Sequence, residues 1–390
     1  MGIDFLIMKK KSIIILAVVL CLAFAAIAFM LPDILTAGKV PYVIVDCDLG
    51  YMNDDALALS MLLKAEEEGK IKLLGITLEG GNNFISAEYE NYGALVSSQE
   101  LNAANLLEAA GRQDIPVIKG TDYPMGFGKD NIDSLAGFYE DLSYLEDCDT
   151  YGAIHFFTSL SSGELTDSYS ACDFLIQSVK EHKDNLVIIA LGPVMNIARA
   201  VEKEPSFASG VSAIYYMGGA FGDDYPAADA EGAAVTAIGG ANVSPYCEYN
   251  ACYDASAFQT CLTAGFPLQY ISPGETTADI DQAYVAAQLE KADKDDKIAA
   301  LWLDFYENNM QEYPYWDPIV SASFLKPASV SLKHGFVSVN NDRNDEYYAM
   351  TSFVPEEKYV LMSDVEKTLW GEAYIITGFS DFWDFVLELL

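Results

Sequence analysis

Basic residues are scarce in this chain of 390 residues, which has 22 Lys and Arg against 58 Asp and Glu and a formal net charge of −36. A surface this acidic repels phosphate backbones, so we expect no nucleic-acid partner. The sequence also has only 3 His, and its 7 Cys include no C-x-x-C pair and no zinc-ligand spacing. Oxygen atoms are therefore better candidates for metal ligands than nitrogen or sulfur. We expect mainly buried free thiols, with a disulfide as the alternative if the chain is exported.

The N-terminus contains one long apolar run. Lys9, Lys10 and Lys11 precede residues 13–31, which carry no charge. The run is just long enough to cross a bilayer and is longer than the apolar core of a usual signal peptide. We therefore predict a membrane anchor within residues 1–38, with a cleaved signal segment as the alternative. The lysines on its N-terminal side would place residues 39–390 outside the cytoplasm, in a membrane-anchored or secreted protein.

From residue 39 onward, short apolar runs alternate with longer amphipathic stretches. This rhythm predicts an α/β fold with an open, mostly parallel, Rossmann-like sheet and helices on both faces. The expected strands are residues 42–46, 72–78, 186–191, 213–217 and 268–271, and the expected helices are 54–68, 87–110, 171–181, 195–202 and 254–263. Near the C-terminus we expect two short strands at 333–339 and 347–353 and an amphipathic helix at 380–390. Residues 127–164 are acidic and aromatic and break the rhythm, so we interpret them as an inserted lid.

Four carboxylates lie close together after the first expected strand. Asp46 and Asp48 end that strand, and Asp54 and Asp55 begin the next helix. Buried together, they would repel one another unless a cation compensates their charge. Hard oxygen ligands suit Ca²⁺ or Mg²⁺, so we predict a divalent-cation site at the carboxyl end of this strand. The alternative is that they only cap a helix and occupy a solvated turn.

Several later segments match a known family in type and order. They are Asp46-x-Asp48 followed by Asp54-Asp55-Ala56, Gly75-Ile76-Thr77 leading to Gly81-Asn82, Ala190-Leu191-Gly192-Pro193 with Asn196, Met217-Gly218-Gly219, Asn242 with Glu248-Tyr249-Asn250, and Asp317-Pro318. From about residue 40 to the C-terminus the chain resembles the inosine-uridine-preferring nucleoside hydrolases. The resemblance implies a catalytic domain over residues 39–390 that hydrolyses the N-glycosidic bond of ribonucleosides, with Ca²⁺ as cofactor, in a homodimer or homotetramer.

The resemblance also implies roles for individual residues. The calcium ligands would be Asp48, Asp55, Asp317 and the backbone carbonyl of Leu191. Asp48 would in addition be the general base that takes a proton from the attacking water. The residues expected to bind the sugar are Asp54, Asn82, Glu248 and Asn250 at the ribose hydroxyls, Asn242 near the 5′ end, and Met217 in the wall of the pocket.

Two departures from the family pattern affect these expectations. The turn at residues 51–53, just before Asp54, is two residues longer than the common spacing, so Tyr51, Met52 or Asn53 must loop out. Trp316 stands where many members have a histidine that protonates the leaving base. Purine-preferring members also have a tryptophan there, which stacks on the base, so the resemblance implies a purine-leaning enzyme with Trp316 as a catalytic residue. The alternative for Trp316 is an ordinary core position.

Two other functions remain open from the sequence. The altered turn and the insertion would also suit a binding protein of the same fold that holds nucleosides or ribose without turnover. An Asp-x-Asp after the first strand is also the signature of haloacid-dehalogenase-like phosphatases. That signature requires Thr or Val at the position of Gly50 and a later lysine for which the chain has no well-placed candidate.

Overall fold

The computed structural model describes residues 39–50, 54–81, 96–127, 166–221, 248–278, 282–292, 295–308, 315–345 and 347–390. Tyr42–Leu390 form one compact unit. The predicted N-terminal anchor, the turn at 51–53, Asn82, Asn242 and nearly all of the predicted lid lie outside the described residues. Among the helices that are described, none is both long and apolar enough to span a membrane.

A single sheet of nine strands organises the described part of the chain, in the order β3-β2-β1-β4-β5-β6-β9-β7-β8. Its strands are β1 (Tyr42–Cys47), β2 (Lys72–Leu78), β3 (Val117–Lys119), β4 (Leu186–Ala190), β5 (Ala213–Met217), β6 (Gln269–Ser272), β7 (Val330–Val339), β8 (Thr351–Val354) and β9 (Gly371–Phe379). All neighbouring pairs from β3 to β9 are parallel, and β7 pairs antiparallel with both β9 and β8. The predicted open, mostly parallel α/β sheet is confirmed.

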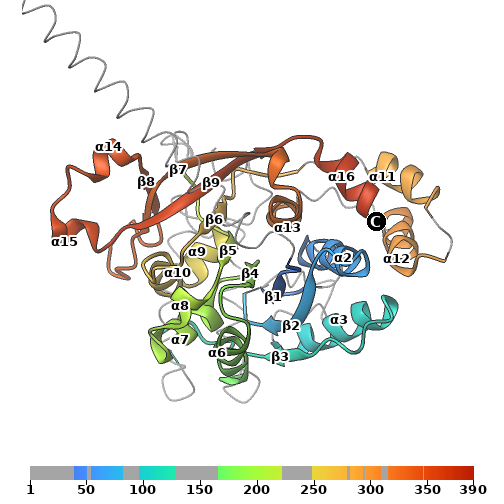
Figure 1. The fold of residues 1–390 in the computed structure, drawn as a ribbon, viewed down its shortest axis with the longest axis horizontal. Coiled ribbons are helices and arrows are strands. Elements are labelled where there is room, and N and C mark those ends of the chain that lie inside the picture. Colours follow the sequence, from blue (N-terminus) through green and yellow to red (C-terminus); the bar gives the residue numbers. More distant parts are fainter. Residues whose placement is uncertain are drawn as a thin grey trace, which may run out of the picture. The chain divides into compact units, whose positions relative to one another are not determined.

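Helices cover both faces of the sheet. They are α2 (Asp54–Glu67), α3 (Val96–Ala109), α6 (Ser170–His182), α7 (Met195–Lys203), α8 (Phe207–Gly210), α9 (Tyr249–Tyr253), α10 (Ala255–Leu262), α11 (Gln282–Leu289), α12 (Lys297–Asn308), α13 (Asp317–Leu325), the 3₁₀ helix η4 (Pro327–Ser329), α14 (Glu356–Tyr359), α15 (Asp364–Lys367) and α16 (Phe382–Leu389). Along β1, Val43 and Val45 join one apolar cluster and Ile44 joins the other, because side chains alternate across a strand. Figure 1 shows α2 and α13 on one side of β1, and α6 and α7 on the other.

The predicted elements agree with the structure in most places. The two short strands predicted near the C-terminus are β7 and β8, which pair antiparallel, although β8 begins only at Thr351; the last predicted helix is α16. The expectation of buried free thiols is confirmed for Cys47, Cys172, Cys252 and Cys261. The sequence reasoning missed β3, which has only three residues, and β9, whose small and hydroxyl residues dilute its apolar pattern. It also missed α11 and α12, so the sheet is wider and better covered than we predicted.

Candidate active site

The centre of the site is the carboxyl end of β1. This strand is an interior strand of the sheet, between β2 and β4, and its apolar residues Val43 to Val45 are fully buried. Asp46 and Asp48 follow directly and are themselves buried. Because β1, β2 and β4 are parallel, the turns that follow all three strands meet at this edge.

Three carboxylates meet above this edge. Asp54 and Asp55 lie in the first turn of α2, and Asp317 is the first residue of α13. In this trio, one carboxylate oxygen from each residue lies within 4.8 Å of the other two, and all three residues are buried. Acidic residues are favourable at helix N-termini, where backbone N–H groups point outward. Two helix N-termini therefore converge on one point, each contributing carboxylates.

The charges of these groups act on one another. Burial raises the pKa of Asp317 well above its usual value, and the neighbouring carboxylates of Asp54, Asp55 and Asp48 raise it further. Burial also raises the pKa of Asp48, again with help from the carboxylates around it. The pKa of Asp54 rises to about 6 because the group is buried, and backbone N–H groups partly offset this rise. Such a cluster holds its full negative charge at neutral pH only with a compensating cation.

The structure thus brings Asp48, Asp55 and Asp317, the predicted calcium acids, to one place. Asp54, which we expected to bind ribose, lies in the same carboxylate trio as Asp55 and Asp317. Asp48 lies at the β1 side of the trio, within its electrostatic influence. The ligand role of each residue remains a prediction.

Asn250 links two other predicted site residues, Leu191 and Met217. Its side-chain Nδ2 donates to the carbonyl oxygen of Leu191 at 2.8 Å, and it lies 3.3 Å from both the carbonyl oxygen and the Sδ of Met217. A carbonyl oxygen has two lone pairs, so this bond leaves Leu191 one acceptor position for a cation. The ends of β4 and β5 and the start of α9 are held together in this way.

Glu248 is the N-cap of α9. Its carboxylate accepts hydrogen bonds from the backbone N–H groups of Asn250 at 2.8 Å, Ala251 at 3.1 Å and Gly219 at 2.9 Å. Burial raises its pKa to about 7. A carboxylate has about four lone-pair positions, so a predicted bond to a ribose hydroxyl would use the one that these three amides leave.

Trp316 is the N-cap of α13 and lies beside the trio. Its backbone N–H is 3.4 Å from Oδ2 of Asp54, and its indole Nε1–H donates to the carbonyl oxygen of Gly274 at 2.9 Å. The residue is 5 % exposed. The bond to Gly274 fixes the orientation of the ring, and only a small part of it is accessible to a substrate.

Sequence reasoning gave no role to Glu79, which is fully buried after β2. Its carboxylate accepts from the backbone N–H groups of Val194 at 2.6 Å and Asn196 at 3.1 Å, and so caps the start of α7. The side chain of Asn196 in turn donates to Asp46 at 2.9 Å. The only sequence signal was an acid at the end of a strand before two glycines, which also fits an ordinary turn.

Gly192 shows how tightly this layer is packed. A Cβ at this position would lie 2.9 Å from Oε1 of Glu79 and 3.1 Å from Oδ1 of Asp48. The turn after β4 can approach both carboxylates only because it carries no side chain there. Leu191, whose carbonyl is a predicted ligand, directly precedes this glycine.

Comparison with known proteins agrees with this geometry. The family model described as inosine-uridine preferring nucleoside hydrolase matches residues 43–369. The chain belongs to this family. It is 33% identical over 312 residues to "Uridine nucleosidase 1" of Arabidopsis thaliana, which covers 77% of this chain and 79% of that one. It is 27% identical to "Probable uridine nucleosidase 2" of Oryza sativa subsp. japonica, over 76% of this chain and 77% of the relative.

Solved nucleoside hydrolases share the fold. A plant nucleoside hydrolase, PpNRh1, superimposes with a TM-score of 0.57 at 24% identity, covering 90% of this chain and 97% of that one. A purine-preferring ribonucleoside hydrolase from Gardnerella vaginalis gives a TM-score of 0.56 at 21% identity, covering 89% and 98%.

Nucleoside hydrolases use a metal ion, and the residues of this chain fit one. The trio of Asp54, Asp55 and Asp317 offers only carboxylate oxygens, all buried and mutually repelling. Hard oxygen donors of this kind are typical of Ca²⁺ and Mg²⁺ sites. Asp48 and the carbonyl of Leu191, the other two predicted ligands, lie at the same edge of the sheet.

Proposed function

We propose that this chain hydrolyses the N-glycosidic bond of ribonucleosides in a calcium-dependent reaction that releases free base and ribose. The observation that supports this most strongly is the convergence of Asp54, Asp55 and Asp317, from two helix N-termini, above Asp48 at the end of β1. Membership of the nucleoside hydrolase family supplies the reaction class. It also leaves the phosphatase alternative without support.

Each group in the site has a chemical task in this proposal. A bound divalent cation supplies positive charge that lowers the pKa of water and attracts hydroxyl oxygens. Asp48 takes the proton of the attacking water, for which an ionised carboxylate beside the cation is suited. Glu248 and Asn250 orient the ribose. The surrounding carboxylates stabilise the positive charge that develops on the sugar ring as the bond to the base breaks.

Base preference has two candidates. Trp316 beside the trio favours a purine-leaning enzyme, with the indole against the base. The names of the plant relatives, which are uridine nucleosidases, favour uridine instead. The small exposed part of Trp316 limits the contact with a base, so the purine preference depends on this one ring.

The test is the release of reducing sugar and of free base from inosine, guanosine, adenosine, uridine and cytidine by the purified full chain. We expect release from at least one of them, loss of release with a calcium chelator, and recovery when calcium is added back. Recovery with Mg²⁺ alone would contradict the calcium assignment. Binding of nucleoside by calorimetry without any release would favour the alternative of a binding protein without turnover.

We also propose that the N-terminal segment anchors the chain and places its catalytic domain outside the cytoplasm, as a homodimer or homotetramer. Protease added to intact cells should then degrade the catalytic domain. Protection of the domain in intact cells would contradict this location. Light scattering of the purified chain would measure its oligomeric state.

A further inference from the structure

A cavity beside α7 and α10 is lined by none of the carboxylates of the candidate active site. It has a volume of about 810 Å³. Its lining residues come from the segment after β3, from the residue before α6, from α7 and α10 and from the loop after β7. Those that carry the argument are Arg199, Lys203, Ser256, Thr260 and Arg343. This size is within the range of small-molecule sites in proteins. None of these residues belongs to the candidate active site.

The lining of the cavity is rich in basic residues compared with the rest of the chain. Three of its lining residues, Arg199, Lys203 and Arg343, are cationic, in a chain with only 22 basic residues and a net charge of −36. Ser256 and Thr260 add hydroxyl groups to the same wall. A mixture of guanidinium, ammonium and hydroxyl donors is typical of sites for phosphate groups.

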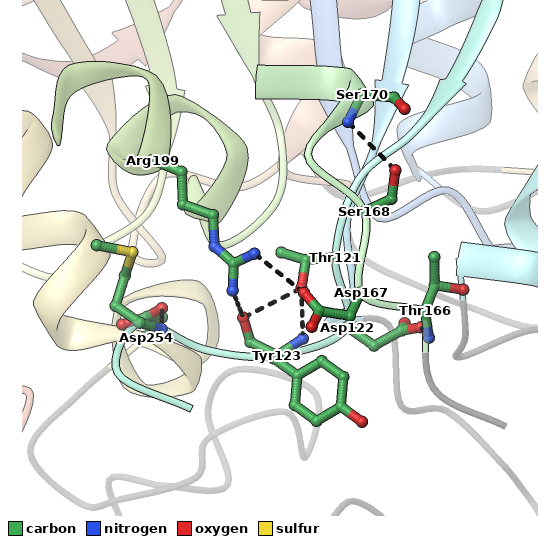
Figure 2. Close-up of polar contacts among 10 residues, drawn as sticks. Thr121, Asp122, Tyr123, Thr166, Asp167, Ser168, Ser170, Arg199 and Asp254 are labelled. Atoms are coloured by element: carbon green, nitrogen blue, oxygen red, sulfur yellow. Dashed lines mark hydrogen bonds and ion pairs between the residues drawn. The ribbon is translucent and has the colours of Figure 1, made fainter. Parts of the chain in front are cut away.

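Arg199 is the buried member of this group. It is 7 % exposed, and its Nη2 donates to the carbonyl oxygen of Tyr123 at 3.0 Å. Its Nη1 lies 3.6 Å from Oδ1 of Asp167, too far for a hydrogen bond, and has no hydrogen-bond partner within the described residues. Figure 2 shows the guanidinium between Tyr123 and Asp167. Asp167 offsets part of its charge, but a buried N–H group that makes no hydrogen bond is costly, so this nitrogen has a tendency to take an acceptor.

The other two cations are held at the cavity wall. The Nη2 of Arg343 donates to the carbonyl oxygen of Met125 at 2.7 Å, and its guanidinium lies 4.1 Å from the ring centre of Phe127. Lys203 is 48 % exposed and forms an ion pair with Asp173. These contacts fix where the two positive charges lie.

Carboxylates also lie near the cavity. Glu202 lines it, Asp167 and Asp173 neutralise part of the charge of Arg199 and Lys203, and the buried Asp254 does the same for Arg199 and Arg343. An anionic ligand must compete with them. The binding should therefore be moderate in strength and should weaken as ionic strength rises.

We propose that this cavity binds the phosphate group of a small phosphate ester. The Nη1 of Arg199 donates to a phosphate oxygen, and the guanidinium of Arg343 and the ammonium of Lys203 add positive charge beside it. The hydroxyls of Ser256 and Thr260 donate to the remaining oxygen atoms. The same chemistry would hold free inorganic phosphate, so the experiment includes both.

The experiment is calorimetric titration of the full chain with inorganic phosphate, ribose 5-phosphate and ribose at fixed ionic strength. We expect saturable binding of both phosphate compounds at one site per chain. Tighter binding of ribose 5-phosphate would identify an ester as the ligand, and equal binding would identify free phosphate. Absence of saturable binding for both compounds would overturn the proposal, and so would ribose binding as tightly as its phosphate.

Two variants test the position of the site. Lys203→Glu reverses a charge at the cavity, and Arg343→Gln removes one; each should weaken binding of inorganic phosphate by about tenfold or more. The matched control is Lys180→Glu, because Lys180 is 55 % exposed, pairs with Glu204 and does not line the cavity. Equal loss in Lys180→Glu would show a general charge effect and would overturn the assignment. Asp55→Asn should leave phosphate binding intact, which separates this site from the candidate active site.

Discussion

Asp55 at the start of α2 and Asp317 at the start of α13 each place a carboxylate oxygen within 4.8 Å of the other. The two helices pack against each other on the same face of the sheet, so the approach of their first residues follows from the packing of their apolar sides. Like charges this close, in a buried place, destabilise the folded chain unless they are neutralised. The folded chain therefore contains unfavourable electrostatic repulsion among these carboxylates, which a bound cation would remove.

The first prediction concerns the electrostatic repulsion among the carboxylates of the trio. Asp317→Asn removes one of the charges but keeps the shape of the side chain. Without metal, the variant should be more stable than the parent chain, because the repulsion from Asp54 and Asp55 is lost. With calcium the order should reverse: a cation at about 100 times its Kd stabilises the parent by about 2.7 kcal/mol, and the variant should lose most of that gain.

Thermal unfolding with chelator and with calcium measures both effects. Asp114→Asn is the control, because Asp114 is an exposed partner of Arg112 and lies away from the trio. A variant that is less stable than the parent in chelator would show that the three carboxylates do not repel one another in the folded chain.

The second prediction is a pH dependence with a defined sign. Burial raises the pKa of Asp54 to about 6, against a usual value of 3.8. In the metal-free chain its contribution to stability is fully present below the unfolded-state pKa and is lost as pH rises to about 6. Asp48 and Asp317 act in the same direction. Bound calcium requires ionised carboxylates, so the stabilisation by calcium should grow over the same range.

The measurement is the unfolding temperature between pH 4 and pH 7.5 in chelator, for the parent chain and for Asp54→Asn. The many other carboxylates also affect stability, and the comparison with the variant removes their common effect. The difference between the two proteins should change between about pH 4 and 6, with the parent losing stability relative to the variant as pH rises. A constant difference would show that Asp54 has an ordinary pKa.

The third prediction concerns the general base. Asp48→Ala should lower kcat by several orders of magnitude, since proton transfer to a positioned base contributes roughly 10²–10⁴-fold and Asp48 also contacts the predicted cation site. Asp114→Asn again serves as the control and should keep full activity. Thermal unfolding of Asp48→Ala with and without calcium separates the two predicted roles of Asp48. Stabilisation by calcium that persists in the variant would show that the loss of activity comes from the missing base and not from a missing ligand. Activity within tenfold of the parent would remove Asp48 from the mechanism.

The fourth prediction tests the layer behind the cation site. Gly192→Ala would put a Cβ within 2.9 Å of Glu79 and 3.1 Å of Asp48. Overpacking of this kind costs about 1–3 kcal/mol, and it displaces the turn that carries the Leu191 carbonyl. We expect lower stability and weaker calcium binding together. Gly378→Ala is the matched control, because a Cβ there meets nothing within 4 Å, and equal effects of both changes would contradict the argument.

The acidic end of β1 could be predicted because residues adjacent in the sequence indicate it. An apolar run followed by alternating acids indicates a strand that ends at a polar site, and the acids of α2 follow within the same stretch. Asp317 entered only through the family resemblance. Nothing in the residues around it shows that α13 packs on α2, because that contact depends on the fold of the whole chain.

Other features had no signal that sequence reasoning could read. Glu79 resembles any acid at a strand end until the structure shows that it caps α7 from a neighbouring strand. Arg199, Lys203 and Arg343 are ordinary basic residues in the sequence, and the cavity between them forms only when α7 and the loop after β7 come together. The strand β9 was missed because its apolar residues are interrupted, yet it joins the parallel strands to the C-terminal hairpin.

The last prediction decides the role of Trp316. If its ring stacks on the base, Trp316→Leu should lower the ratio of kcat/KM for inosine to kcat/KM for uridine by about tenfold, because stacking on an aromatic ring contributes about 1–3 kcal/mol per base. Trp316→Phe keeps a ring but loses the N–H bond to Gly274, so it should change the ratio less. The ratio does not depend on how much of the variant folds, since both substrates use the same folded enzyme.

Trp302→Phe is the matched control for this experiment. Trp302 is fully buried in α12, and its Nε1–H donates to Oγ of Ser60 at 2.9 Å, so the change removes an equivalent bond in the core. It should lower stability and leave the ratio unchanged. If Trp316→Leu behaves in the same way, Trp316 is a core residue, and the base preference of this chain must be set by residues other than Trp316.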